Sequence, residues 1–148
     1  MYTSILFLHI LSATIWTGGH LVLSIAILPR ALKRRSPEIL QQFESWYEPL
    51  GLPAFALQLI TGLWLAWRYV PDVKIWVSFA SPYATLIACK LILVVLSLSL
   101  ALDARLRLIP KLSPQTLPAM AWHILAITVL AVLFVGVGVG FRVGGFLF

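Results

Sequence analysis

The chain has 148 residues, of which 61% are hydrophobic and only 11% are charged, and its mean hydropathy is +0.98. A soluble domain has a smaller apolar fraction and about twice this share of charged residues, so the composition excludes that class and predicts an integral membrane protein. The net charge of +6 is explained by membrane topology and contact with anionic lipid, so no nucleic-acid partner is predicted.

Four apolar runs are long enough to cross the bilayer, at about residues 3–28, 51–70, 83–102 and 118–141. A hydrocarbon core about 30 Å thick needs roughly 20 helical residues. The runs fill nearly the whole chain, which predicts one all-α domain over residues 1–148, an antiparallel four-helix bundle in the membrane. The first run is longer than the apolar region of a signal peptide and follows no basic residue, so we expect it to be retained.

The loops differ in basic residues. Seven Lys and Arg residues follow the first and third runs, and three lie on the other side. Cytoplasmic loops retain positive charge, so both termini are predicted on the periplasmic or equivalent side of a bacterial inner or other energy-transducing membrane. On the cytoplasmic face, residues 37–48 alternate apolar and polar positions at helical spacing and predict an interfacial amphipathic helix.

The first run carries three conspicuous side chains, His9, Trp16 and His20. At about 100° per residue they share one stripe of the helix. A rise of about 1.5 Å per residue puts His9 roughly 9 Å and His20 roughly 25 Å below the outer boundary. Imidazoles inside a membrane helix are functional-site candidates, so this stripe is predicted to face the bundle interior.

His123 in the fourth run is predicted roughly 22 Å from the outer boundary, a depth that matches His20. Facing imidazoles hold haem b in helical bundles, and small residues must clear room for the flat macrocycle. Gly19, directly before His20, fits that need, and Arg30 is a candidate partner for a propionate. The first hypothesis is therefore a small haem b protein for redox chemistry or electron transfer with a redox partner.

Copper is the alternative ligand. Met120 and His123 are three residues apart on one helical face, and with His20 they offer two imidazole nitrogens and a thioether sulfur, a set that suits Cu(I). A third hypothesis is a structural subunit of a larger membrane complex. No enzymatic reaction is assigned.

Two further features concern the later runs. Lys90 in the third run lies roughly 10 Å deep, level with His9, so the two residues are predicted to form a second polar station. Gly136, Gly140 and Gly144 have small-xxx-small spacing, which permits close helix packing either in a homodimer or inside one bundle.

The sequence resembles the CopD-type copper-resistance membrane proteins. The resemblance rests on Leu8-His9, Trp16-Thr17-Gly18-Gly19, Leu28-Pro29, Gly62-Leu63-Trp64 and Cys89-Lys90-Leu91. It implies a copper-binding or copper-transport function.

The order and spacing of these residues are also similar to those of the HemJ-type protoporphyrinogen oxidases, which bind haem b. Their first-helix histidine, the tryptophan seven residues later and the third-helix lysine correspond to His9, Trp16 and Lys90. That resemblance implies haem ligation or substrate chemistry for His9 and contact with an anionic group for Lys90. The chain has four helices where that family has five.

Overall fold

The computed structural model describes residues 1–145 and is helical almost throughout. The first membrane helix comprises α1 (Tyr2–Val22), a π-helical turn (Leu23–Ile27) and α2 (Leu28–Arg34) in one continuous rod. The second is α3 (Glu38–Tyr69). The third is α4 (Pro82–Asp103), continued by a π-helical turn (Ala104–Leu108) and a 3-10 turn (Ile109–Lys111), and the fourth is α5 (Leu117–Val143).

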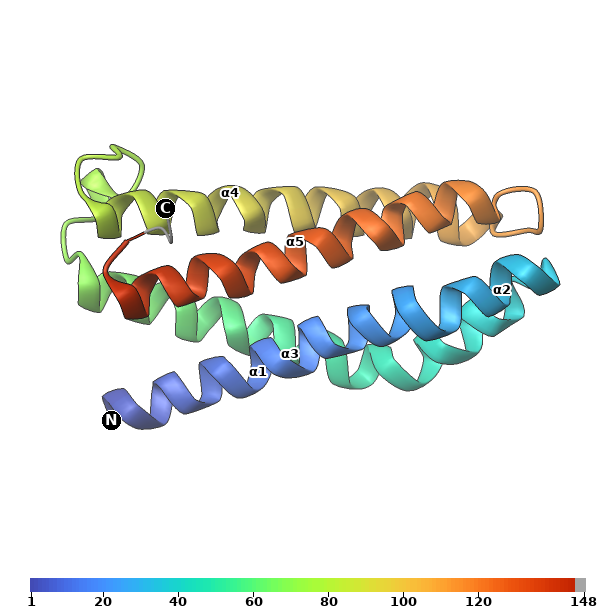
Figure 1. Cartoon of the computed structure of the whole chain (residues 1–148), viewed down its shortest axis with the longest axis horizontal. Helices are drawn as coiled ribbons and strands as arrows, with labels where there is room; N and C mark the ends of the chain where they lie inside the picture. The colour runs from blue at the N-terminus through green and yellow to red at the C-terminus, as the bar shows by residue number, and fades with distance from the viewer. Residues whose placement is uncertain (146–148) are drawn as a thin grey trace.

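The four helices run antiparallel, so that the start of α1 and the end of α5 lie at the same end of the bundle (Figure 1). Helix α1 packs against α3 and α5, and α4 packs against α5. All four rods are long and apolar enough to cross a membrane. The prediction of an all-α, membrane-embedded four-helix bundle is confirmed.

Helix α3 differs from the expected arrangement. Residues 37–48 were predicted to form a separate interfacial helix, but the structure joins them to the membrane-spanning helix as one element of 32 residues. Pro49 and Pro53 lie inside α3, where each removes one backbone hydrogen bond without ending the helix. The N-terminal part of α3 is held by packing, because Leu40 is buried in the core.

The short connections use ordinary capping chemistry. Arg35, with a φ of 49°, ends α2 in the left-handed conformation. Between α3 and α4, a side-chain oxygen of Asp72 accepts a hydrogen bond from the Lys74 amide, and the Ser81 hydroxyl accepts one from the Ala84 amide at the start of α4. Ser81 therefore caps the start of a membrane helix, while Asp72 caps the short 3-10 turn Val73–Ile75 in the loop.

The core contains two apolar layers at different depths. The aromatic layer draws on all four rods and consists of Trp16, Phe55, Leu93, Ala131 and Phe134. The inner apolar layer lies nearer the α2 end and consists of Leu28, Ala31, Leu40, Leu117, Met120, Ala121 and Ile124. Buried polar side chains lie outside both layers, which divides the interior into alternating apolar and polar zones.

The glycines of α5 have different surroundings. A methyl group added at Gly140 would lie 2.7 Å from a terminal carbon of the buried Leu86 and 3.0 Å from the main-chain oxygen of Gly145. A methyl group at Gly136 would meet nothing within 4 Å. Gly140 therefore serves packing of α5 against α4 inside one bundle, while the face at Gly136 is open.

This difference gives a matched test. We expect Gly140→Ala to lower the free energy of unfolding by about 1–3 kcal/mol, because overpacking displaces Leu86 or the backbone. Gly136→Ala should leave stability unchanged or raise it by up to about 1 kcal/mol through helix propensity. Thermal unfolding of both variants in detergent measures the difference, and equal melting temperatures would contradict the packing described.

Candidate functional site

His9 lies in a polar layer in the half of the bundle that holds the start of α1, which we name the outer half. Its Nδ1 is 2.9 Å from the Thr61 hydroxyl oxygen, which itself lies 2.6 Å from the main-chain oxygen of Leu57. A hydroxyl has one proton, and the Leu57 oxygen can only accept, so Thr61 donates to Leu57 and accepts from His9 Nδ1. This arrangement leaves the lone pair on Nε2 of His9 free for a ligand.

Lys90 completes this outer polar layer. Its Nζ lies 5.4 Å from the centroid of the Phe141 ring, beside Gly138 of α5. The pairing of Lys90 with His9 in one station stays a prediction. The outer polar layer consists of His9, Ser12, Gln58, Thr61 and Lys90.

A second polar layer lies inward of the aromatic layer and contains His20. The Thr128 hydroxyl oxygen is 3.2 Å from the main-chain oxygen of His20, which fixes the register of α1 against α5. Two buried polar atoms in this layer, Thr17 Oγ1 and His20 Nδ1, have no hydrogen-bond partner within residues 1–145, and with Thr128 these residues form the inner polar layer. Ser97 Oγ of α4 is a further buried oxygen without a partner in these residues.

The ring of His20 is held between two aromatic side chains. Trp16 meets it edge to face at 4.9 Å between centroids, and Tyr47 of α3 meets it at 6.0 Å. The Tyr47 hydroxyl donates to the main-chain oxygen of Trp16 at 2.9 Å, so α3 is tied to α1 beside His20. These contacts orient the His20 ring without using its nitrogens.

The space beside Gly19 is occupied by the protein itself. A Cβ at Gly19 would overlap the ring of Tyr47, and a Cβ at Gly51 would also collide with it. In the same way, the face of Gly62 is covered by the His9 imidazole. The space beside Gly19 that a flat macrocycle would need is therefore filled by the Tyr47 ring, and the space beside Gly62 is filled by the His9 imidazole.

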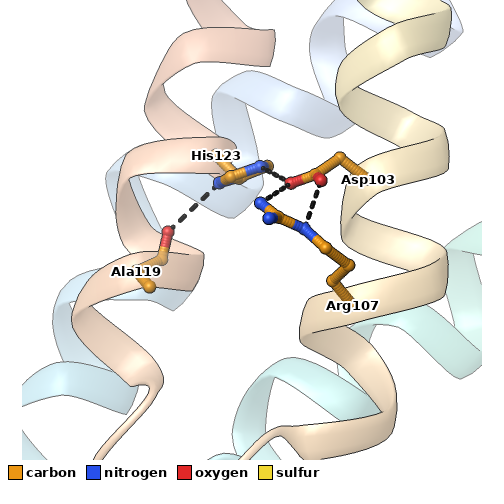
Figure 2. Close-up of polar contacts among 4 residues, drawn as sticks. All are labelled: Asp103, Arg107, Ala119 and His123. Atoms are coloured by element: carbon orange, nitrogen blue, oxygen red, sulfur yellow. Dashed lines mark hydrogen bonds and ion pairs between the residues drawn. The ribbon is translucent and has the colours of Figure 1, made fainter.

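His123 has different partners. Its Nε2 lies 2.7 Å from Oδ2 of Asp103 on α4, and its Nδ1 lies 3.3 Å from the main-chain oxygen of Ala119 (Figure 2). Arg107 binds the same carboxylate, with Nη2 at 2.9 Å from Oδ2. Each ring nitrogen of His123 therefore has a protein oxygen within hydrogen-bond distance.

The predicted set of His20, His123 and Met120 is not assembled. The contact to Thr128 places His20 five residues along α5 from His123, or roughly 8 Å further from the inner end of the helix. Met120 packs in the inner apolar layer, and Arg30 is exposed. Within the described part of the chain, no three His, Cys, Asp or Glu side chains are grouped in a way that would hold a metal ion.

Sequence reasoning missed several residues of these sites. Asp103 carried a usable signal, because it is an acidic residue at the end of an apolar run with Arg107 one turn later. Tyr47 was assigned to an interfacial helix, and Thr17 and Ser97 are common in membrane helices. Nothing in their spacing showed that their oxygens would lack partners.

The comparison with protein families matches residues 41–141, more than half of the chain, to copper resistance protein D. The chain belongs to the CopD family. The match includes Lys90, Met120 and His123 but begins after His9 and His20, so any role of the two α1 imidazoles rests on the structure of this chain. The HemJ-type resemblance receives no support. Searches of curated proteins and of solved structures found no match.

The contact between the Tyr47 ring and Gly19 gives a second matched test. Gly19→Ala should lower the free energy of unfolding by about 1–3 kcal/mol through collision with the Tyr47 ring. Gly18→Ala, with nothing within 4 Å of the added methyl, should be neutral or stabilising. In a double-mutant cycle, Tyr47→Ala should remove the penalty of Gly19→Ala. Additive effects of these two substitutions would show that the ring does not occupy that space.

Proposed function

We propose that this CopD family member binds copper ions inside the membrane as its cargo, on the imidazoles of His9 and His20. The family is named for copper resistance. The observation that carries the proposal is the contrast among the three histidines. Among residues 1–145, His9 forms its hydrogen bond through Nδ1 and the buried His20 Nδ1 has no partner, whereas both nitrogens of His123 lie within hydrogen-bond distance of protein oxygens.

The proposed outer copper station is His9, whose imidazole is already oriented by a hydrogen bond through Nδ1. Imidazoles that bind metals usually donate their other ring N–H to a protein oxygen, which fixes the tautomer and the ring orientation. His9 has this arrangement through Thr61, with Nε2 as the free donor atom. Imidazole nitrogen is a suitable ligand for copper.

The proposed inner copper station is His20, whose imidazole is oriented by packing against aromatic rings. Trp16 and Tyr47 hold the His20 ring from two sides, and the buried Nδ1 has no hydrogen-bond partner in the described residues. A buried polar atom without a partner costs free energy, so a bound ion or water at this nitrogen would stabilise the folded state. The same argument does not apply to His123.

A haem b held by His20 and His123 fits the residues less well. Axial ligation needs a lone pair on each imidazole, but Asp103 and the Ala119 oxygen engage His123. The Tyr47 ring also fills the space beside Gly19. No contact among the described residues favours a macrocycle, so copper is the preferred ligand.

Copper binding by matched histidine variants tests the proposal. Purified protein in detergent is titrated with Cu(I) under reducing conditions against a competing chelator, and the stoichiometry is measured. We expect His9→Gln and His20→Gln each to remove one of two bound copper ions, and His123→Gln to retain both. Loss of copper only in His123→Gln would contradict the assignment. A Soret band in protein from haem-replete cells would support the haem hypothesis instead, and binding of neither ligand would favour a structural subunit.

We also propose that both termini face the periplasmic or equivalent side, on the strength of seven basic residues on one side against three on the other. In a Cys89→Ala background, a cysteine at Ser78 between α3 and α4 should react in intact cells with an impermeant thiol reagent. A cysteine at Ser113, between α4 and α5, should react only after lysis. The reverse pattern would overturn the orientation.

A further inference from the structure

The aromatic layer lies directly between the two proposed copper stations. On α1, Trp16 follows His9 by seven residues, roughly 10 Å along the axis, and precedes His20 by one turn. Its side chain is only 6% exposed. Any ion that moves from the outer to the inner polar layer within the bundle must therefore pass the level of Trp16.

The contacts of Trp16 make this layer dense. The ring stacks on Phe55 of α3 at 4.8 Å between centroids and meets Phe134 of α5 edge to face at 5.8 Å. Leu93 of α4 and Ala131 of α5 complete the layer. All four rods thus contribute apolar groups at one depth, and none of these five side chains offers a ligand atom to copper.

The inner polar layer is also closed on its other side. Met120, Leu28 and Ile124 belong to the inner apolar layer, which separates His20 from the basic end of the bundle. Ser97 lies midway between Lys90 and Asp103 on α4, which face Gly138 and His123 of α5, so it is level with Ala131 of the aromatic layer. Ser97 is 2% exposed and Thr17 is 7% exposed.

We propose that Trp16 and its aromatic partners form the closure between an outer copper station at His9 and an occluded inner station at His20. This inference rests on the proposed function and adds the path by which copper moves between His9 and His20. The unpartnered oxygen of Thr17, three residues before His20 on α1, is the group that can orient water around an ion on His20. Copper passes from one station to the other when the Trp16 ring leaves the layer.

The structure indicates how that ring is held. Its indole is fixed by Phe55 and Phe134, and its main-chain oxygen accepts a hydrogen bond from Tyr47. The Trp16 ring also contacts His20 directly, so a ligand that reorients the imidazole changes the packing of the closure. Binding at the inner station and opening of the layer are therefore coupled through one side-chain contact.

The test measures how fast bound copper can be removed from outside. Protein in lipid vesicles is loaded with Cu(I) and mixed with an excess of an impermeant Cu(I) chelator. The unsubstituted protein should lose one ion rapidly, from His9, and one slowly, from His20. His20→Gln should lack the slow phase. Trp16→Ala should accelerate it on the order of ten-fold or more, because removing a tightly packed Trp opens the layer.

Trp122→Ala is the control, since this tryptophan is 73% exposed on the outside of α5; it should leave the slow phase unchanged. If Trp16→Ala does not fold, Phe55→Ala removes the stacked partner of Trp16 and should accelerate release in the same direction. Two ions lost at one rapid rate from unsubstituted protein would overturn the proposal. So would a slow phase that neither substitution changes.

A copper-independent measurement separates failure of the closure from failure of copper binding. In a Cys89→Ala background, a cysteine at Thr128, whose side chain reaches the main chain of His20, should react slowly with an impermeant thiol reagent added from outside and much faster when Trp16→Ala is also present. Slow labelling that Trp16→Ala accelerates supports the closure even if no copper is bound. Rapid labelling with Trp16 intact would contradict it.

Discussion

The packing of Trp16 at the centre of the bundle is the contact on which the rest of the interior depends. Its ring joins α1 to α3 through Phe55, to α5 through Phe134 and to the His20 imidazole one turn away. Its main-chain oxygen also receives the Tyr47 hydroxyl. In a bilayer, association of helices is driven by close packing and interhelical hydrogen bonds, because lipid tails are as apolar as the side chains they replace. One aromatic residue therefore both holds the helices together and separates two polar zones.

The three histidines differ in the hydrogen-bond partners of their ring nitrogens, and this difference determines which of them has a nitrogen available to a ligand. Thr61 accepts a hydrogen bond from Nδ1–H of His9 because its own hydroxyl donates to the main-chain oxygen of Leu57. His20 is fixed by rings and lacks a polar partner at Nδ1 in the described residues. His123 is tied to Asp103 at the inner end of α4 and α5, where Arg107 shares the carboxylate. We propose that the first two bind copper ions, whereas the third links α4 to α5.

The sequence predicted the four membrane helices and their antiparallel order, because length and hydropathy determine which segments can span a bilayer. It did not predict that residues 37–48 continue into α3, since Pro49 and Pro53 resemble helix boundaries and only the burial of Leu40 shows otherwise. The pairing of His20 with His123 relied on depth counted along straight helices. Whether His20 and His123 meet depends on the register of α1 against α5 and on the position of Asp103. Both are set by packing between helices.

The central claim is that copper is bound by the imidazoles of α1 without the thioether of Met120. The X-ray absorption spectrum of copper-loaded protein tests this most directly, because it separates nitrogen from sulfur scatterers around the metal. The account predicts imidazole nitrogen scattering with no sulfur shell, and loss of part of the imidazole signal in His9→Gln and in His20→Gln. A copper–sulfur shell that disappears in Met120→Leu, with His123→Gln also altering the spectrum, would contradict it.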